Sequence, residues 1–135
     1  MKFKNEAEKE HFVKQGLKYY SDYFEAMFWA DIDDREDLEY DGYLDFSSID
    51  LDSAVKQIED LDKFFQSAES ILEWTEYTDA QAQHDFYLTR CGHGAGFWDG
   101  DHCSSEMGQV LTTMAQSFGP VDIVVSSDGV IYLYS

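Results

Sequence analysis

Carboxylate side chains are concentrated in one stretch of this sequence, and their joint charge is the first chemistry that the chain offers. Residues 31–62 carry thirteen of them against two cations, Arg35 and Lys56, a local net charge of −11 out of −19 for the whole chain. Repulsion on this scale destabilises a compact fold, and solubility alone needs far fewer charges. A functional use of the negative field itself is therefore one interpretation of the sequence. The thirteen residues are Asp31, Asp33, Asp34, Glu36, Asp37, Glu39, Asp41, Asp45, Asp50, Asp52, Glu59, Asp60 and Asp62.

Clustered carboxylates also have more ordinary uses. A charged stretch is often a solvated face or a flexible segment, and that interpretation stays open. The chain lacks the Asp-x-Asp-x-Asp-Gly loop with a glutamate at its twelfth position, which excludes an EF-hand calcium site. Acid–base catalysis needs a pair of carboxylates in a pocket with one raised pKa, and the sequence singles out no such pair.

Four potential zinc ligands lie within thirteen residues in the last third of the chain. Cys91 and His93 form a Cys-x-His pair, and His102 and Cys103 are adjacent, whereas structural zinc sites usually separate paired ligands by two to four residues. Two cysteines are too few for a disulfide framework, so we predict free thiols. We expect no metal ion, no cofactor and no catalytic residue. A metal-binding protein or enzyme built on Cys91, His93, Asp99 and His102 remains one alternative to the main prediction given below.

Three alternating glycines begin the loop at residues 92–100. Their pattern lacks the dinucleotide-binding spacing and a lysine, and it leads into Asp99 and Asp101, which would repel a phosphate. Glycines permit positive φ and tight turns, so we expect a structural loop with Phe97 and Trp98 packed back onto the core. Whether the loop has another role stays open.

Apolar residues at steps of three or four predict the helices that must position these groups. One pattern covers residues 6–29, and a second covers residues 51–77 with Asp50 or Asp52 as its N-cap. Residues 31–48 lack a clean period, so we expect an acidic loop between the two helices.

The last third of the chain predicts a strand, a loop, a helix and a hairpin. An Asp-Gly pair at Asp128 and Gly129 is a strong signal for the hairpin turn. Arg90 is the only cation after Lys63, and we predict that it pairs with an acid. The predicted elements are a strand at 85–90, a helix that Ser104 or Ser105 begins and Gly119 with Pro120 stops, and strands at 121–126 and 130–134.

Length and composition limit the architecture to one core. With 135 residues, 44% of them hydrophobic and 16% aromatic, we expect a single domain over residues 1–135. Its predicted class is α+β, with helices packed on a small, mainly antiparallel, three-stranded sheet. Residues 1–84 are mainly helical and include the acidic segment 31–62, whereas residues 85–135 form the strand, loop, helix and hairpin. No apolar run approaches the ~20 residues that span a bilayer, so we expect no membrane contact and a cytoplasmic protein.

The segment from Leu88 to Asp99, with the sequence LTRCGHGAGFWD, carries a resemblance. It resembles a segment of small uncharacterised proteins encoded by bacteriophages and mobile elements, which typically have Asn at the position of Cys91 and often Arg at the position of Gly100. The resemblance covers about residues 85–135. It implies a phage or mobile-element origin, and hence the host bacterial cytoplasm, and it supplies no catalytic residue.

The acidic composition is similar to that of phage inhibitors of restriction enzymes, of uracil-DNA glycosylase and of CRISPR effectors. Duplex DNA presents one negative charge per ~1.7 Å of axis, and a groove of Lys and Arg does not easily distinguish phosphates from suitably spaced carboxylates. We therefore predict a DNA mimic, not an enzyme, that inhibits a basic nucleic-acid-binding protein of the host. The thirteen carboxylates would form the binding surface, with Tyr40 and Tyr43 as local anchors.

Two further alternatives belong beside this prediction. The protein could be a structural or regulatory phage protein whose acidity only keeps it soluble and whose exposed aromatic residues bind a partner. Two copies could also join as a homodimer and lengthen the charged surface. Direct binding to nucleic acid is not expected, because a polyanion is repelled by phosphates. The sequence does not identify the target protein.

Overall fold

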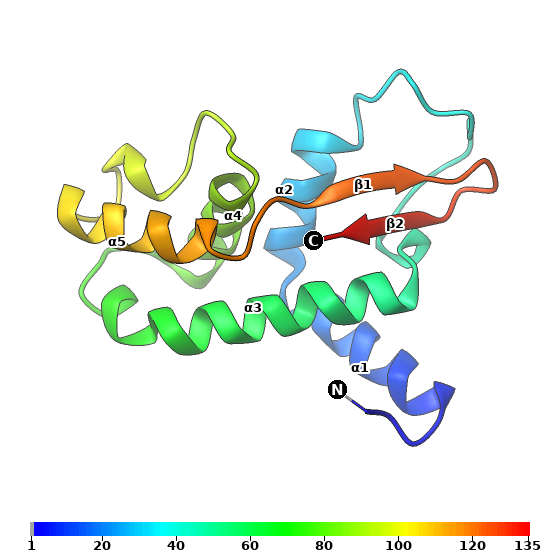
Figure 1. Cartoon of the computed structure of the whole chain (residues 1–135), viewed down its shortest axis with the longest axis horizontal. Coiled ribbons are helices and arrows are strands. Elements are labelled where there is room, and N and C mark those ends of the chain that lie inside the picture. The colour runs from blue at the N-terminus through cyan, green and yellow to red at the C-terminus, as the bar shows by residue number, and fades with distance from the viewer. Residues whose placement is uncertain (1) are drawn as a thin grey trace.

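A long helix, α3 (Leu51–Leu72), runs along one side of the molecule. The structure, a computed structural model, describes residues 2–135, and Met1 lies outside them. The hairpin lies beside the N-terminal half of α3 and α5 lies beside its C-terminal half (Figure 1). The other elements are α1 (Glu6–Tyr19), α2 (Ser21–Asp31), α4 (Asp79–Arg90), α5 (Ser105–Gln116), β1 (Asp122–Val125), β2 (Ile131–Tyr134) and 3₁₀ turns at Phe46–Ser48 and Phe97–Asp99. The predicted α+β class is confirmed, and the chain is mostly helical.

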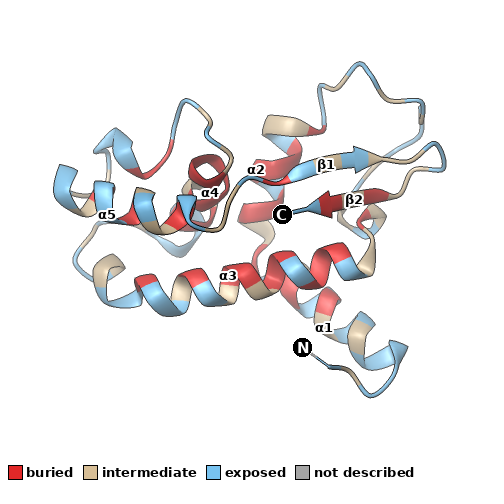
Figure 2. Ribbon diagram, in the orientation of Figure 1, coloured by how far each residue is buried: buried red, intermediate tan, exposed pale blue. Residues whose placement is uncertain are grey.

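The core lies where α2, α3, α4 and β2 face one another (Figure 2). Its centre is aromatic: the Phe64 ring of α3 stacks on the Phe86 ring of α4 with 4.1 Å between centroids, and Phe97 packs 5.7 Å from Phe64. Stacked aromatic rings add stabilisation beyond the area that they bury. No helix within residues 2–135 has both the length and the apolar character to cross a membrane.

The first predicted helix, over residues 6–29, is two helices that meet at Tyr20. Gln83 of α4 is inserted at the junction: its side-chain amide donates to the Tyr19 carbonyl at 3.3 Å and accepts from the Tyr23 N–H at 3.3 Å. In an unbroken helix those two backbone groups would bond to each other, so Gln83 replaces that hydrogen bond. The apolar period continues across the break, which is why it predicts one helix.

The predicted strand at residues 85–90 is wrong, because this segment is the C-terminal half of α4. Thr78 caps the helix: its hydroxyl accepts from the Gln81 N–H at 3.2 Å, and the Gln81 side chain accepts from the Thr78 N–H at 3.1 Å. This reciprocal pair is a capping box, and the Thr-x-x-Gln sequence that forms it is visible without a structure. The local run Phe-Tyr-Leu-Thr favours a strand only if the cap upstream is overlooked.

The sheet has two strands among residues 2–135, not three. β1 and β2 pair in antiparallel register, with Val125 opposite Ile131, around the predicted Asp-Gly turn. Gly129 there has φ +86°, which glycine adopts at little cost. A third segment meets the hairpin only at one parallel bridge, between Ile49 and Ile131, where the Asp50 N–H donates to the Ile131 carbonyl at 2.8 Å.

Caps fix the ends of α3 and α5 close to where the sequence predicts them. Asp50 caps α3 by accepting from the Ser53 N–H at 3.1 Å, and Ser104 caps α5. α3 ends at Leu72, not near Tyr77, because the Thr75 hydroxyl donates to the Leu72 carbonyl at 2.7 Å and the chain turns there. The predicted stop of α5 before Gly119 is confirmed.

Arg90 pairs with an acid, as predicted, and does so in the core. Its guanidinium contacts Asp60 of α3 at 3.1 Å, and both side chains are almost fully buried. It also donates to the carbonyl oxygens of Phe118 and Gly119, at 3.2 and 2.9 Å, and to the Tyr23 hydroxyl at 3.3 Å. One buried cation therefore joins α2, α3, α4 and the end of α5.

Candidate functional site

The segment at residues 33–45, which we name the acidic loop, follows α2 and is fixed to the hairpin (Figure 1). Arg35 donates to the Ile123 carbonyl of β1 at 3.0 Å. It also contacts both carboxylate oxygens of Asp37 at 3.1 Å, and this ion pair lowers the pKa of Asp37. One planar side chain thus holds the start of the loop against the sheet and constrains a carboxylate two residues later.

Tyr40 holds the middle of the acidic loop on the hairpin turn. A Cβ atom built on Gly129 would lie 2.6 Å from the Tyr40 ring, so the ring packs directly on this glycine. Tyr40 is half-buried by this contact. The ring is thus engaged within the protein on one side and partly exposed, and its role as an anchor for a partner stays a prediction.

The end of the acidic loop is fixed by a cap and by aromatic packing. Asp45 accepts from the Ser47 N–H at 2.9 Å and begins the 3₁₀ turn. Phe46 then packs against Phe24 and Phe28 of α2, with ring centroids 5.9 and 5.3 Å apart. The loop is irregular in conformation, yet it is attached to the core at its start, middle and end.

Seven of the thirteen predicted carboxylates lie on this loop with their side chains exposed. Arg35 is the only Lys or Arg on the loop, so these charges are largely uncompensated within it. They therefore gather negative charge at one end of the molecule. The seven are Asp33, Asp34, Glu36, Asp37, Glu39, Asp41 and Asp45.

The other predicted carboxylates do not join this array. Asp60 is only 2% exposed and bonds to Arg90 and to Lys56, so its assignment to a binding surface is wrong. Asp31 accepts from Tyr87 and contacts His93, and Asp62 accepts from Tyr20. The side chains of these three acids are engaged by partners within the protein, and the amino-acid sequence alone does not reveal this.

Three more of the thirteen lie on or next to α3, on the far side of the hairpin from the acidic loop (Figure 1). Asp50 serves as the helix cap, Glu59 is half-buried, and Asp52 is exposed in an ion pair with Lys9. The predicted single surface of thirteen carboxylates is thus reduced to the seven on the loop.

A hollow at the base of the acidic loop combines aromatic walls with an acidic rim. Tyr43 is 84% exposed at its edge, and Phe28 and Phe46 form its wall. Glu25 of α2 and Asp33 lie on the rim, and no Lys or Arg lines the hollow. Tyr43, which the sequence predicts as an anchor, is thus exposed at this hollow.

Glu25 and Trp29 are surface residues that sequence reasoning missed. Glu25 also lines a second hollow, between α2 and α4, which contains Trp29, His84 and Asp85. Trp29 is 67% exposed, and its ring lies 6.2 Å from that of His84. Both residues lie on the exposed face of α2, four residues apart, in the stretch of residues 1–30, whose charges sum to zero.

Cys91 and His93 line one hollow together with Asp31 and Arg35. Burial raises the pKa of the Cys91 thiol, which disfavours the reactive thiolate. The His93 ring contacts Asp31 at 2.9 Å. Cys91 and Cys103 are free thiols, as predicted. Among residues 2–135, no three His, Cys, Asp or Glu side chains are placed to hold a metal ion.

The glycine-rich loop packs on α4 through one buried ring. Phe97 is fully buried, and its N–H donates to the Thr89 hydroxyl at 3.1 Å. Gly96 lies so close that a Cβ there would be 2.2 Å from the Thr89 hydroxyl oxygen. Trp98, also predicted to pack inward, is instead 52% exposed.

Comparison with known proteins assigns this chain to no family. No protein-family model, curated protein or solved structure matches it. Its function is therefore inferred from the charge, exposure and packing of the residues described above.

Proposed function

We propose that this protein is an acidic inhibitor that imitates DNA and occupies the nucleic-acid-binding groove of a basic host protein. The observation that carries the proposal is the acidic loop, with seven exposed carboxylates on a segment fixed to the hairpin by Arg35 and Tyr40. An anchored segment has already lost much of its conformational entropy, so it binds at a lower entropic cost than a flexible polyanion.

The density of charge on the loop supports this proposal. Thirteen residues at about 3.3 Å each extend over at most about 43 Å, so neighbouring carboxylates are on average about 6 Å apart or closer along the chain. One DNA strand presents a phosphate about every 3.4 Å of axis. The two densities agree within about a factor of two, and a row of Lys and Arg that fits phosphates meets a carboxylate at about every second position.

The hollow beside Tyr43 would add a local contact to this long-range attraction. Electrostatic steering raises association rates, whereas affinity depends on a few well-packed residues near the centre of an interface. Tyr43, with Glu25 and Asp33 beside it, offers such a place to an arginine or aromatic side chain of the partner. The acidic loop and this hollow are therefore proposed to act together.

A second candidate function is binding through exposed aromatic residues alone. It is favoured by the exposure of Trp29, Tyr43 and Trp74, which are large apolar side chains in contact with solvent. In that case the carboxylates only keep the protein soluble. The two candidates differ in their dependence on salt, because exposed charges are screened and apolar contacts are not.

The experiment that tests the proposal is capture of binding proteins from a bacterial lysate, followed by elution with duplex DNA. We expect the wild-type protein to retain basic nucleic-acid-binding proteins, and a short DNA duplex to release them in competition. A loop variant with Asp33→Asn, Asp34→Asn, Glu39→Gln and Asp41→Asn should retain far less of them. These four acids have no hydrogen-bonding role in the anchors of the loop, so the loop itself should persist.

A matched control removes four exposed carboxylates from other surfaces. Glu10→Gln, Glu76→Gln, Asp101→Asn and Glu106→Gln change the net charge by the same amount. The control should capture the same proteins as the wild type. Equal capture by the loop variant, or bound proteins that duplex DNA does not displace, would contradict the proposal.

A further inference from the structure

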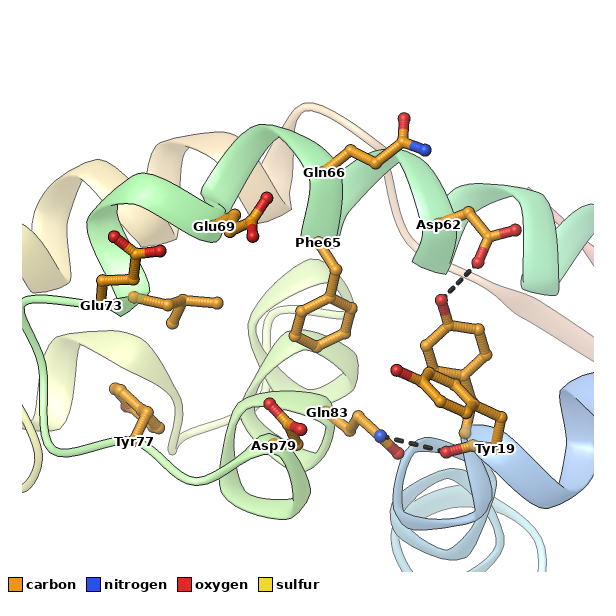
Figure 3. A pocket seen from close by; sticks show the side chains of 11 residues that line it. Tyr19, Asp62, Phe65, Gln66, Glu69, Glu73, Tyr77, Asp79 and Gln83 are labelled. Atoms are coloured by element: carbon orange, nitrogen blue, oxygen red, sulfur yellow. Dashed lines mark hydrogen bonds between the residues drawn. The ribbon is translucent and has the colours of Figure 1, made fainter.

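A groove between α3 and α4 lies apart from the acidic loop, along the C-terminal half of α3 (Figure 3). Phe65 and Leu72 of α3, Tyr77 of the following turn, and Tyr19 and Tyr20 at the junction of α1 and α2 give it an aromatic and aliphatic lining. It is an open groove and not an enclosed cavity, so it can admit an extended side chain from outside.

Every formally charged residue in the lining of this groove is an acid. Asp62 and Glu69 lie two turns apart on α3, Glu73 is the residue after this helix, and Asp79 comes from the start of α4 on the opposite side. Asp62 accepts from the Tyr20 hydroxyl, whereas Glu69, Glu73 and Asp79 are exposed. The groove therefore combines an apolar lining with uncompensated negative charge at its edges.

The Phe65 ring points from α3 into the groove, with Glu69 further along the same helix and Asp79 across the groove on α4 (Figure 3). Phe65 stacks on Tyr20 with centroids 6.1 Å apart and an angle of 14° between the rings, and it contacts Phe64 at 5.2 Å. These contacts hold the ring in place. An aromatic surface in a groove that is also lined by carboxylates attracts a cation by its quadrupole and by ion pairing.

We propose that this groove binds an arginine side chain from a basic segment of a partner protein. A guanidinium group is planar, stacks on aromatic rings and donates several hydrogen bonds in its plane, so it can lie against Phe65 while pairing with Glu69 and Asp79. A lysine ammonium is a more strongly hydrated point charge and gains less from the ring. The site is separate from the acidic loop, and its test does not depend on the DNA-mimic proposal.

The test is an NMR titration of the ¹⁵N-labelled full chain with the peptide Ac-Gly-Arg-Gly-Arg-Gly-NH₂ at about 0.15 M salt, where distant charges are screened. Two matched peptides carry lysine or the neutral isostere citrulline in place of arginine, and spermidine is titrated separately. We expect shifts concentrated at the amides that line the groove, the strongest binding for the arginine peptide, and none for citrulline. Shifts spread over all acidic surfaces, or lysine or spermidine binding as tightly as arginine, would overturn the assignment.

Two variants locate the binding. Glu69→Gln with Asp79→Asn should weaken binding of the arginine peptide by roughly three- to tenfold, as expected for two exposed ion pairs. Phe65→Leu keeps an apolar side chain and should weaken it by roughly two- to fivefold. The ¹⁵N spectra report whether each variant is folded. A control with Glu10→Gln and Glu106→Gln, and the loop variant, should bind as the wild type does; unchanged affinity in both groove variants would overturn the proposal.

Discussion

Replacing Arg90 with methionine tests the claim that a buried cation joins four elements of this fold. The Arg90 and Asp60 side chains are 0% and 3% exposed, and they meet at 3.1 Å. Methionine would leave Asp60 in the core with Lys56 as its remaining charged partner, at 2.7 Å. It would also remove the donors that serve the carbonyl oxygens of Phe118 and Gly119.

The expected cost of Arg90→Met follows from these contacts. Removing one partner of a buried ion pair costs about 3–5 kcal/mol, because the other charge stays buried. Each neutral hydrogen bond that is lost adds about 1 kcal/mol, although the contributions are not additive. Methionine keeps part of the apolar contact with Phe86 and Phe118 that the Arg90 guanidinium makes from above their rings. We therefore expect a loss of about 3–5 kcal/mol, a large share of the ~5–15 kcal/mol typical of a domain.

Urea unfolding followed by circular dichroism measures this loss, with Arg35→Met as the control. Arg35 pairs with the exposed Asp37, and its loss should cost no more than about 1–2 kcal/mol of global stability. The double variant Arg90→Met with Asp60→Leu should be more stable than Arg90→Met alone, because no charge is left buried. A stability of Arg90→Met within 1 kcal/mol of the wild type would refute the reasoning.

Three further predictions concern single residues. Gln83→Leu should cost about 1–3 kcal/mol in a denaturant titration, because it removes the side-chain amide that donates to the Tyr19 carbonyl, while the Tyr23 N–H keeps only the Tyr20 carbonyl as its acceptor. Gly129→Ala should lower the thermal midpoint by several degrees, because the added Cβ would clash with the Tyr40 ring and because φ is +86° at this position. An unchanged midpoint would show that the acidic loop does not pack on the hairpin turn. At pH 8.5 Cys91 should react with iodoacetamide more slowly than an unhindered thiol, because burial raises the pKa of Cys91 and so lowers its thiolate fraction. Its reaction rate, measured by mass spectrometry, should increase as the pH rises.

The sequence predicts those elements whose signals are local. The hairpin follows from alternating apolar residues around Asp128 and Gly129, and α5 follows from Ser104 at its start and Gly119 at its end. The capping box at Thr78 is equally local, so α4 could have been predicted in place of a strand at residues 85–90. That error came from giving β-propensity more importance than a helix-start signal.

The break between α1 and α2 depends on a contact that no local pattern contains. Gln83 lies 60 residues or more from the backbone groups that it bonds. Because Tyr23, Phe24 and Met27 continue the apolar period of α1, a single helix and a broken one have the same pattern of hydrophobic residues. Only the packing of α4 against the junction distinguishes the two.

The position of the candidate surface could be predicted from the sequence, but not which carboxylates belong to it. Charge density alone points to the acidic loop, and seven of its carboxylates are exposed. Asp60 is a carboxylate like those on the loop, yet it is buried because it lies on the face of α3 that contacts Arg90. Arg90 comes 30 residues later in the chain, so the local sequence does not show this pair. Glu25 and Trp29 were missed for the converse reason, since a segment without net charge gives no electrostatic signal.

The most direct test of the central claim is the salt dependence of the affinity between this protein and its captured partner. Measured between about 50 and 200 mM salt, the dissociation constant of the wild type should rise at least about tenfold, because exposed charges are screened over this range. In the loop variant lacking the charges of Asp33, Asp34, Glu39 and Asp41 the dependence should be clearly shallower, whereas the matched control should retain it. An affinity that does not change with salt, or the same dependence in the loop variant and the wild type, would contradict the imitation of DNA by the acidic loop.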